Sequence, residues 1–386
     1  MIDRVLRPAL TASLLALAAS GALGQLAVSA NDNKATLDNG TNKVVANPPA
    51  DTVTVIDLGA RPPKVVAELN VPTSVVGPPM SVAVSPDESL ALVTRASKLD
   101  PADATKVVAD DTLTVIDLKA SPPAVLATLK AGLGASGVSF NKQGTLALVA
   151  NRNEGTVSVF SVSDRTLTPA GTVKLGDATS GPSHVVFAPD GKTALVTRDG
   201  DSTLSLLAVD GSKVESAKRD FAAGLRPYGL DISADGRIAV VANIGRNLGD
   251  ADTVSVIDLQ AKPMRVVETV TVGPTPEGIQ LSPDGKTLAV VIHNGSGKAK
   301  ESPFYNANGL LLLYRFEGLK PVKFAQAPVG RWSQGIAFSR DGGTILVQNM
   351  LERDIQVFKL EGATLTDTGQ RIKLNGGGAA IRTAKY

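Results

Sequence analysis

The 386-residue chain contains no cysteine. This excludes disulfide bonds, thiol catalysis, cysteine-ligated zinc, covalent haem attachment and a lipid anchor on cysteine. Only two histidines are present, His184 and His293, so a histidine-rich metal site is excluded as well. Aromatic residues make up 4% of the chain, and Trp332 is the single tryptophan. The 39 basic and 37 acidic side chains nearly balance, so net charge gives no general reason to expect a nucleic-acid partner, although a local basic patch would permit one.

Long apolar runs are absent after the N-terminus, where two arginines precede an apolar stretch at 9–23. The stretch is short for a bilayer span and is followed by small residues, as in a secretory signal peptide. The pattern predicts a signal peptide within 1–30, cleaved after Gly24 or Ala30, and one folded domain over 31–386. We therefore expect a periplasmic or secreted, monomeric protein without a membrane span in the mature chain.

One strand pattern recurs six times along the rest of the chain. Each copy has an apolar strand, a turn similar to Ser-Pro-Asp-Gly, a second apolar strand ending in Asn or Arg, and a strictly alternating third strand such as TVSVIDL at 253–259. Asp caps such a turn and Gly accepts its positive φ. The turn recurs every 45 to 57 residues, the length of one propeller blade. The paired first and second strands lie at 82–95, 138–151, 185–198, 230–243, 279–292 and 336–349.

A seventh unit is completed when the two ends of the chain are joined. The N-terminal part supplies 39–47, 52–58 and 64–71, which match strands two, three and four, and the missing first strand matches 377–384. The fold class predicted is an all-β, seven-bladed β-propeller of four-stranded antiparallel blades. We expect the C-terminal strand to close the ring by pairing with 43–47 of the N-terminal blade, which removes an open sheet edge.

The ends of the second strands carry a further signal. The segments LVTR (92–95 and 195–198), LVAN (148–151), VVAN (44–47 and 240–243) and LVQN (346–349) resemble the Tyr-Val-Thr-Asn signature of YVTN-repeat β-propellers, with Leu or Val in place of Tyr. The resemblance covers essentially the whole mature chain. It implies a fold similar to surface-layer and lactonase-fold propellers outside the cytoplasm, and it leaves the function open. The WD dipeptide of WD40 repeats is absent.

Propellers bind ligands at one mouth of the central channel. The loops that enter the first strands would place one residue of each blade at that mouth, namely Met80, Ser136, Ser183, Tyr228, Glu277, Gln334 and Ala379. A second ring would come from the ends of the second strands, namely Asn47, Arg95, Asn151, Arg198, Asn243 and Asn349, with 292–294 in the remaining unit. Asparagine at such an end satisfies backbone groups of nearby loops, whereas arginine has no such use.

We predict a ligand-binding face at this mouth. It comprises Arg95, Arg198, Arg226, Tyr228, Glu277, Arg331 and Trp332. Arginines favour an anion, and aromatic rings beside them can stack on a ligand, although these arginines can also be ordinary surface partners of nearby carboxylates. Changing Arg95 and Arg198 to Asn should then leave folding nearly unaffected and weaken binding.

Catalytic candidates are few, because no G-x-S-x-G, H-E-x-x-H or P-loop motif is present. Glu277 with His184 or His293 is the one possible acid–base or metal-binding set; each of the three can equally be a packed or solvated residue. No cofactor is predicted. Aspartates in the long loops 96–111 and 243–252 leave Ca²⁺ open, and the polar loop 293–308 is typical of a flap.

Three functions remain open from the sequence. The main hypothesis is a non-catalytic binding or scaffold propeller that recognises a protein partner or a small anionic ligand at the channel mouth. The alternatives are a lactonase-like hydrolase using Glu277 and a histidine, and an accessory platform subunit of a periplasmic redox system. Clustering of Glu277 with the histidines would favour the hydrolase, and a large exposed apolar patch would favour the platform.

Overall fold

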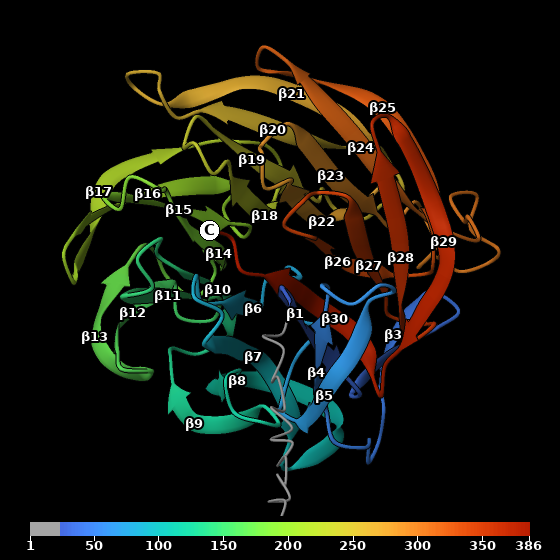
Figure 1. Cartoon of the computed structure of the whole chain (residues 1–386), viewed down its shortest axis with the longest axis horizontal. Coiled ribbons are helices and arrows are strands. Elements are labelled where there is room, and N and C mark those ends of the chain that lie inside the picture. Colours follow the sequence, from blue (N-terminus) through green and yellow to red (C-terminus); the bar gives the residue numbers. More distant parts are fainter. Residues whose placement is uncertain (1–23) are drawn as a thin grey trace, which may run out of the picture.

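The computed structural model describes residues 24–386, which form a closed ring of seven four-stranded antiparallel sheets (Figure 1). This confirms the predicted seven-bladed propeller. The described residues contain strands but no helix, and hence no helix that could cross a membrane. The predicted signal peptide falls mainly on 1–23, outside the described residues.

Each blade runs outward from an innermost strand beside the channel, and we number the blades from the one that holds β1. Blade 1 contains β30 (Gly377–Thr383), β1 (Leu26–Asp32), β4 (Thr52–Asp57) and β5 (Lys64–Asn70). Blade 2 contains β6 (Val82–Val84), β7 (Leu90–Asp100), β8 (Asp103–Asp117) and β9 (Ala124–Lys130). Blade 3 contains β10 (Ala135–Phe140), β11 (Leu146–Asn151), β12 (Thr156–Ser163) and β13 (Thr166–Lys174).

The other four blades repeat the same order. Blade 4 contains β14 (Pro182–Phe187), β15 (Thr193–Arg198), β16 (Thr203–Asp210) and β17 (Lys213–Phe221). Blade 5 contains β18 (Pro227–Ile232), β19 (Ile238–Asn243), β20 (Asp252–Asp258) and β21 (Arg265–Gly273). Blade 6 contains β22 (Pro276–Leu281), β23 (Thr287–Ile292), β24 (Gly309–Glu317) and β25 (Lys320–Val329). Blade 7 contains β26 (Ser333–Phe338), β27 (Thr344–Asn349), β28 (Asp354–Glu361) and β29 (Thr364–Lys373).

The hydrophobic core lies between the blades rather than inside any one of them. One cluster joins Leu92 of blade 2 to Phe140 and Phe160 of blade 3, and another joins Ala289 of blade 6 to Phe338 of blade 7. The second and third strands are therefore covered on both faces. This explains why the second and third strands hold apolar or small residues at most positions.

Ring closure follows the prediction, but with a different partner strand. Strand β30 pairs antiparallel with β1, from Ala27 opposite Thr383 to Asp32 opposite Gly377. The expected partner at 43–47 is wrong, because 41–44 is strand β3 of a separate hairpin. The true second strand, LAVSAND, is fully buried. Since it lies partly within the predicted signal peptide, the propeller begins before residue 31, and of the two predicted cleavage sites only that after Gly24 leaves β1 intact.

Two insertions differ from the loops expected. Strands β2 (Ala35–Asp38) and β3 (Thr41–Val44) form a two-stranded hairpin between β1 and β4. The segment 96–111 is not a loop, because β7 and β8 extend as a hairpin through pairs such as Leu99 with Val107. Both insertions project from the mouth that carries the second-strand ends.

Candidate functional site

The channel opens at this mouth into a cavity of about 750 Å³. The starts of the first strands contribute Tyr228, Glu277 and Gln334 to its lining, as predicted from the repeat. The ends of the second strands contribute Arg152 and His293. The structure thus brings together two carboxyl groups, those of Asp32 and Glu277, with one imidazole, one phenol and two guanidinium groups.

The second ring of channel residues lies one position later than the sequence suggested. Side chains alternate across a strand, so the residue after the recurring Asn or Arg faces the other way. In blade order these residues are Asp32, Ala96, Arg152, Asp199, Ile244, His293 and Met350. Four of them, Asp32, Arg152, Ile244 and His293, line the cavity. The signal was present in the sequence, because this position carries charged or imidazole side chains in four blades.

The residue before the first strand adopts a left-handed backbone conformation in five blades. In blades 3 and 4 this residue is Gly134 or Gly181, with φ of 77° and 61°. In blades 5 to 7 it is Arg226, Thr275 or Trp332, with φ between 49° and 55°. A left-handed conformation costs a non-glycine residue on the order of 1 kcal/mol. All three of these residues line the cavity, as expected where side-chain chemistry at the mouth outweighs backbone strain.

The same turns hold the channel residues in place. The carbonyl of Gly134 accepts a hydrogen bond from the backbone N–H of Arg152, and that of Thr275 accepts one from His293. The equivalent bond joins Ile244 to Arg226. In blades 3 to 6 the entry loop therefore fixes the residue that follows the second strand of the same blade.

Asp199 organises the two arginines of the cavity. Its carboxylate lies 2.9 Å from the Arg152 guanidinium and 2.9 Å from that of Arg226, and it accepts a hydrogen bond from Ser183 Oγ at 2.6 Å. Burial acts to raise the pKa of Asp199, but Arg152 and the hydrogen bonds outweigh it and lower the pKa. Two fixed cations therefore share one fixed anion, which leaves a net positive charge beside Glu277.

Glu277 is strongly affected by burial. Burial raises the pKa of its carboxyl to about 8, against the opposing influence of Arg226 and Arg152. Its Oε2 is buried and has no hydrogen-bond partner within 24–386. A carboxyl that exchanges its proton near neutral pH is suited to general acid–base catalysis.

His293 is the neighbour of Glu277. Its Nε2 lies 3.8 Å from Glu277 Oε1 and 3.4 Å from Gln334 Nε2. Burial lowers the pKa of His293 to about 4. Near pH 7 both groups are therefore uncharged, and the contact joins a neutral carboxyl to a neutral imidazole rather than forming an ion pair.

Tyr228 completes the polar lining. Its ring lies under the guanidinium of Arg152, with 5.5 Å between the Arg152 Cζ and the ring centroid. Burial, and then the carboxyl of Glu277, raise the pKa of the phenol, so it remains a hydrogen-bond donor at any pH at which the protein is folded.

The β2–β3 hairpin covers part of the cavity. Its base is fixed by the Lys34 ammonium, 2.5 Å from Asp51. At its tip, Asn39 Nδ2 donates to Glu301 Oε2 at 2.8 Å, and Asn39 Oδ1 accepts from the Lys300 backbone at 3.0 Å. The hairpin of blade 1 thus meets the predicted flap, 293–308, from blade 6.

Three arginines of the predicted face lie outside this cavity. Arg95 contacts Asp110 at 2.6 Å. Arg198 is buried and contacts Asp201 and Asp220. Arg331 contacts the Glu352 carboxylate at 2.8 Å. From the predicted set, the structure brings together only Arg226, Tyr228, Glu277 and Trp332.

His184 is also elsewhere, since it lines a cavity at the opposite mouth. The recurring asparagines serve the backbone, as expected: Asn151 Oδ1 accepts from Gly132 N, and Asn349 Oδ1 from Gly330 N. Asn31, rather than the predicted Asn47, holds this place in blade 1, where it donates to Thr52 and Thr54.

The aspartates considered for Ca²⁺ do not converge. Within 24–386, no three His, Asp or Glu side chains lie close enough together to hold a metal ion. Asp110 contacts Arg95 and Lys98, and Asp252 accepts a hydrogen bond from Thr275 N.

Comparison with known proteins adds to this geometry. Residues 138–300 match the family model described as Lactonase, 7-bladed beta-propeller. The matched segment contains Arg152, Asp199, Arg226, Tyr228, Glu277 and His293. No curated protein matches the chain.

Several solved structures are similar in fold. A candidate 6-phosphogluconolactonase of Bacteroides uniformis is 18% identical, with 94% of this chain and 100% of that chain covered and a TM-score of 0.71. The periplasmic gluconolactonase of Pseudomonas aeruginosa is 17% identical, with 93% and 99% covered and a TM-score of 0.67. The hydrazine synthase of Kuenenia stuttgartiensis is 18% identical, with 82% and 92% covered and a TM-score of 0.62. At these identities the likeness establishes the fold alone.

Proposed function

We propose that the protein is a lactonase-type hydrolase whose active site is the 750 Å³ cavity. The observation that carries the proposal is the buried, partly unsatisfied Glu277, with a pKa of about 8, beside the Arg152–Asp199–Arg226 cluster. The family match over 138–300 supports the reaction class. The proposal replaces the non-catalytic binding function that the sequence favoured.

The proposed reaction opens a cyclic ester with one water molecule. Glu277 in its ionised form accepts a proton from water, and the water oxygen forms a bond to the ester carbonyl carbon. The carbonyl oxygen becomes an oxyanion, which Arg152 or Arg226 stabilises. As the carbonyl re-forms, the bond to the ring oxygen breaks, and that oxygen takes the proton held by Glu277. The product is a hydroxy acid, and Glu277 is again ionised.

The surrounding residues would assist these steps. Tyr228 is a permanent donor to a ring hydroxyl or to the oxyanion, and Trp332 offers an apolar face to the ring. His293 is uncharged near pH 7 and lies 3.8 Å from Glu277, so it adds no positive charge that would lower the pKa of the carboxyl. The net positive charge of the arginine cluster favours the carboxylate product and accords with the anionic ligand expected from the sequence.

We also propose a periplasmic location, in keeping with the predicted signal peptide and with the named location of the Pseudomonas aeruginosa protein. The redox state of the compartment would not affect the stability of the fold through disulfide bonds, since the chain has no cysteine.

The test is turnover of glucono-1,5-lactone by the purified protein, followed by proton release in weak buffer with the spontaneous rate subtracted. We expect Glu277→Gln to lower kcat/KM by about a hundredfold or more, the usual contribution of a general base. Glu215→Gln, an exposed carboxylate on the outer strand β17, is the matched control and should retain full activity. The same assay is repeated with a five-membered lactone. If the wild-type rate equals the spontaneous rate for both lactones while a lactone or its hydroxy acid binds saturably, the result would instead support the non-catalytic function.

A further inference from the structure

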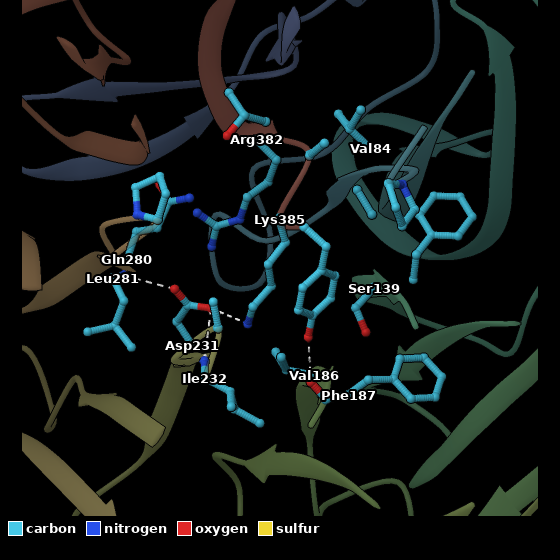
Figure 2. Close-up of a pocket in the computed structure, with 18 of the residues that line it drawn as sticks. Val84, Ser139, Val186, Phe187, Asp231, Ile232, Gln280, Leu281, Arg382 and Lys385 are labelled. Carbon is cyan, nitrogen blue, oxygen red and sulfur yellow. Dashed lines mark hydrogen bonds and ion pairs between the residues drawn. The ribbon is translucent and has the colours of Figure 1, made fainter. Parts of the chain in front are cut away.

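The opposite mouth of the channel holds a second, smaller cavity, lined by the first strands and by the last residues of the chain (Figure 2). Its volume is about 90 Å³, room for about three water molecules or one small polyatomic ion. It lies on the side of the Asp-Gly turns, with Pro86 and Pro283 at its edge, and it shares no lining residue with the proposed active site.

Arg382 on β30 is the central feature of this second cavity. Its Nη1 donates to the carbonyl of Ile336 at 3.2 Å, and Nη2 contacts the sulfur of Met80. Within 24–386, no carboxylate lies within 4 Å of its guanidinium. Burial lowers the pKa of Arg382 to about 10, against the influence of Asp231. Arg382 is partly buried, and a partly buried cation without a direct counter-ion favours an anion that supplies the missing charge.

Asp231, the carboxylate that acts on the pKa of Arg382, already has other partners. Its Oδ1 lies 2.7 Å from Lys385 Nζ, and the same oxygen accepts from Ile232 N at 2.9 Å. Its Oδ2 accepts from Leu281 N at 2.8 Å. With Lys385 and Asp231 compensating each other, Arg382 is, within 24–386, the cation of this lining that no side-chain carboxylate contacts.

Polar groups around Arg382 suit an anion. Figure 2 shows the Arg382 side chain reaching into the cavity toward Gln280 and Asp231. His184 lines the same cavity, and its Nδ1 accepts from Leu230 N at 3.3 Å, which assigns the proton of the neutral ring to Nε2 as a donor. Burial, and then Arg382 and Lys385, lower the pKa of His184 and keep it neutral.

We propose that this second cavity is a binding site for a small oxyanion, held by Arg382 and supported by Lys385 and His184. A bound anion would join β30 of blade 1 to residues from blades 4 and 5, because His184 lies on β14 and Asp231, the partner of Lys385, lies on β18. Its occupancy would therefore stabilise the closed ring. The site is independent of the proposed hydrolase function.

The experiment titrates the full chain with inorganic phosphate at constant ionic strength, using sodium chloride as the balancing salt, and measures heat of binding and Tm. We expect saturable binding and a rise in Tm. Acetate in a parallel titration distinguishes a carboxylate site from a phosphate site: competition between the two ions indicates one site for oxyanions.

Variants locate the site. Arg382→Met keeps an unbranched apolar side chain in place of the arginine stem and removes the charge, and it should raise the phosphate Kd by about tenfold or more, the value expected for losing a charged hydrogen bond. Lys385→Met should also weaken binding, because it leaves the Asp231 carboxylate uncompensated beside the anion, but by less than Arg382→Met, because Lys385 is already paired with Asp231. Lys320→Met, an exposed lysine at the start of β25, should bind as the wild type does.

Equal phosphate affinity in wild type, Arg382→Met and Lys385→Met would overturn the proposal, as would the absence of saturable binding by either ion. If Arg382→Met does not fold, the comparison of Lys385→Met with Lys320→Met decides: equal affinities contradict the site, and weaker binding by Lys385→Met alone supports it.

Discussion

Trp332 and Arg226 hold the left-handed backbone conformation that glycine holds in blades 3 and 4. Replacing Trp332 by Gly removes backbone strain of about 1 kcal/mol and at the same time removes the packing of the ring. We therefore expect the free energy of unfolding of Trp332→Gly to stay within about 1 kcal/mol of the wild-type value. Activity on a lactone should fall, mainly through KM.

Urea denaturation and steady-state kinetics test this prediction together. Trp332→Ala is the matched control, since alanine keeps the strain and also loses the ring; it should be less stable than Trp332→Gly and equally impaired in KM. Unchanged kinetics in both variants would remove Trp332 from the active site.

At the scale of the element, the arginine at the end of a second strand has a different role in blade 2, where it is Arg95, and in blade 4, where it is Arg198. Arg95 compensates Asp110, whose carboxylate is 2% exposed and also contacts Lys98. Despite the opposing effect of burial, Thr112 and these two cations lower the pKa of Asp110 to about 2. Arg198, by contrast, contacts Asp201 and Asp220, which are partly open to water.

Arg95→Asn should accordingly lower the free energy of unfolding at pH 7 by roughly 1–3 kcal/mol, because a buried carboxylate loses one of its two cations. Arg198→Asn should cost less, since Ser205 and Thr203 can accept from asparagine as the equivalent hydroxyls do in blades 3 and 5. Neither change should alter kcat/KM, since neither arginine lines the cavity. Equal stability of Arg95→Asn and wild type at pH 7 would show that the ion pair with Asp110 is not needed. This prediction differs from the sequence-based one, in which both changes weaken binding and leave folding nearly unaffected.

The β2–β3 hairpin is the element that most directly controls access to the cavity. Replacing 35–44 by a short Gly-Ser connection should raise KM and leave Tm nearly unchanged, because the hairpin pairs with no blade and its base is fixed by Lys34 and Asp51. Asn39→Ala, which removes the side-chain contacts with Glu301 and with the Lys300 backbone, should produce a smaller change in the same direction. An unchanged KM in the deletion variant would mean that the hairpin does not cover bound substrate.

At the scale of the whole molecule, ring closure rests on β30. Deletion from Gly377 onward removes the buried Ala380 and Ile381 and exposes the edge of β1. We expect aggregation or a large fall in Tm, measured by size-exclusion chromatography and thermal melting. Deletion of 384–386 alone is the control and should remain monomeric. A monomeric protein of unchanged Tm after the longer deletion would contradict closure by β30.

The repeat was sufficient to predict the architecture, because every blade buries its strands against neighbouring blades in the same way and the turn between its first two strands recurs at similar intervals along the chain. The partner of β30 was missed because VVAN at 44–47 fits the strand-end pattern better than VSAN at 28–31, and only the buried pairing of β1 with β4 distinguishes them. Among site residues, Glu277 and Tyr228 followed from repeat position. Asp199 also occupies a repeat position that carries charged or imidazole side chains in four blades, but its role could not be predicted, since it depends on side chains from blades 3 and 5 that meet it in the channel.

The pH dependence of lactone hydrolysis tests the central claim most directly. With a pKa of about 8 in the folded protein, Glu277 is mostly protonated at pH 6 and becomes available as a base as the pH rises. After subtraction of the spontaneous rate, wild-type kcat/KM should therefore increase from pH 6 and level off above about pH 8, and Glu277→Gln should lose this rise. A wild-type profile that is flat or falls between pH 6 and 9, or a Glu277→Gln variant that keeps the wild-type profile, would contradict the assignment of Glu277 as the general base.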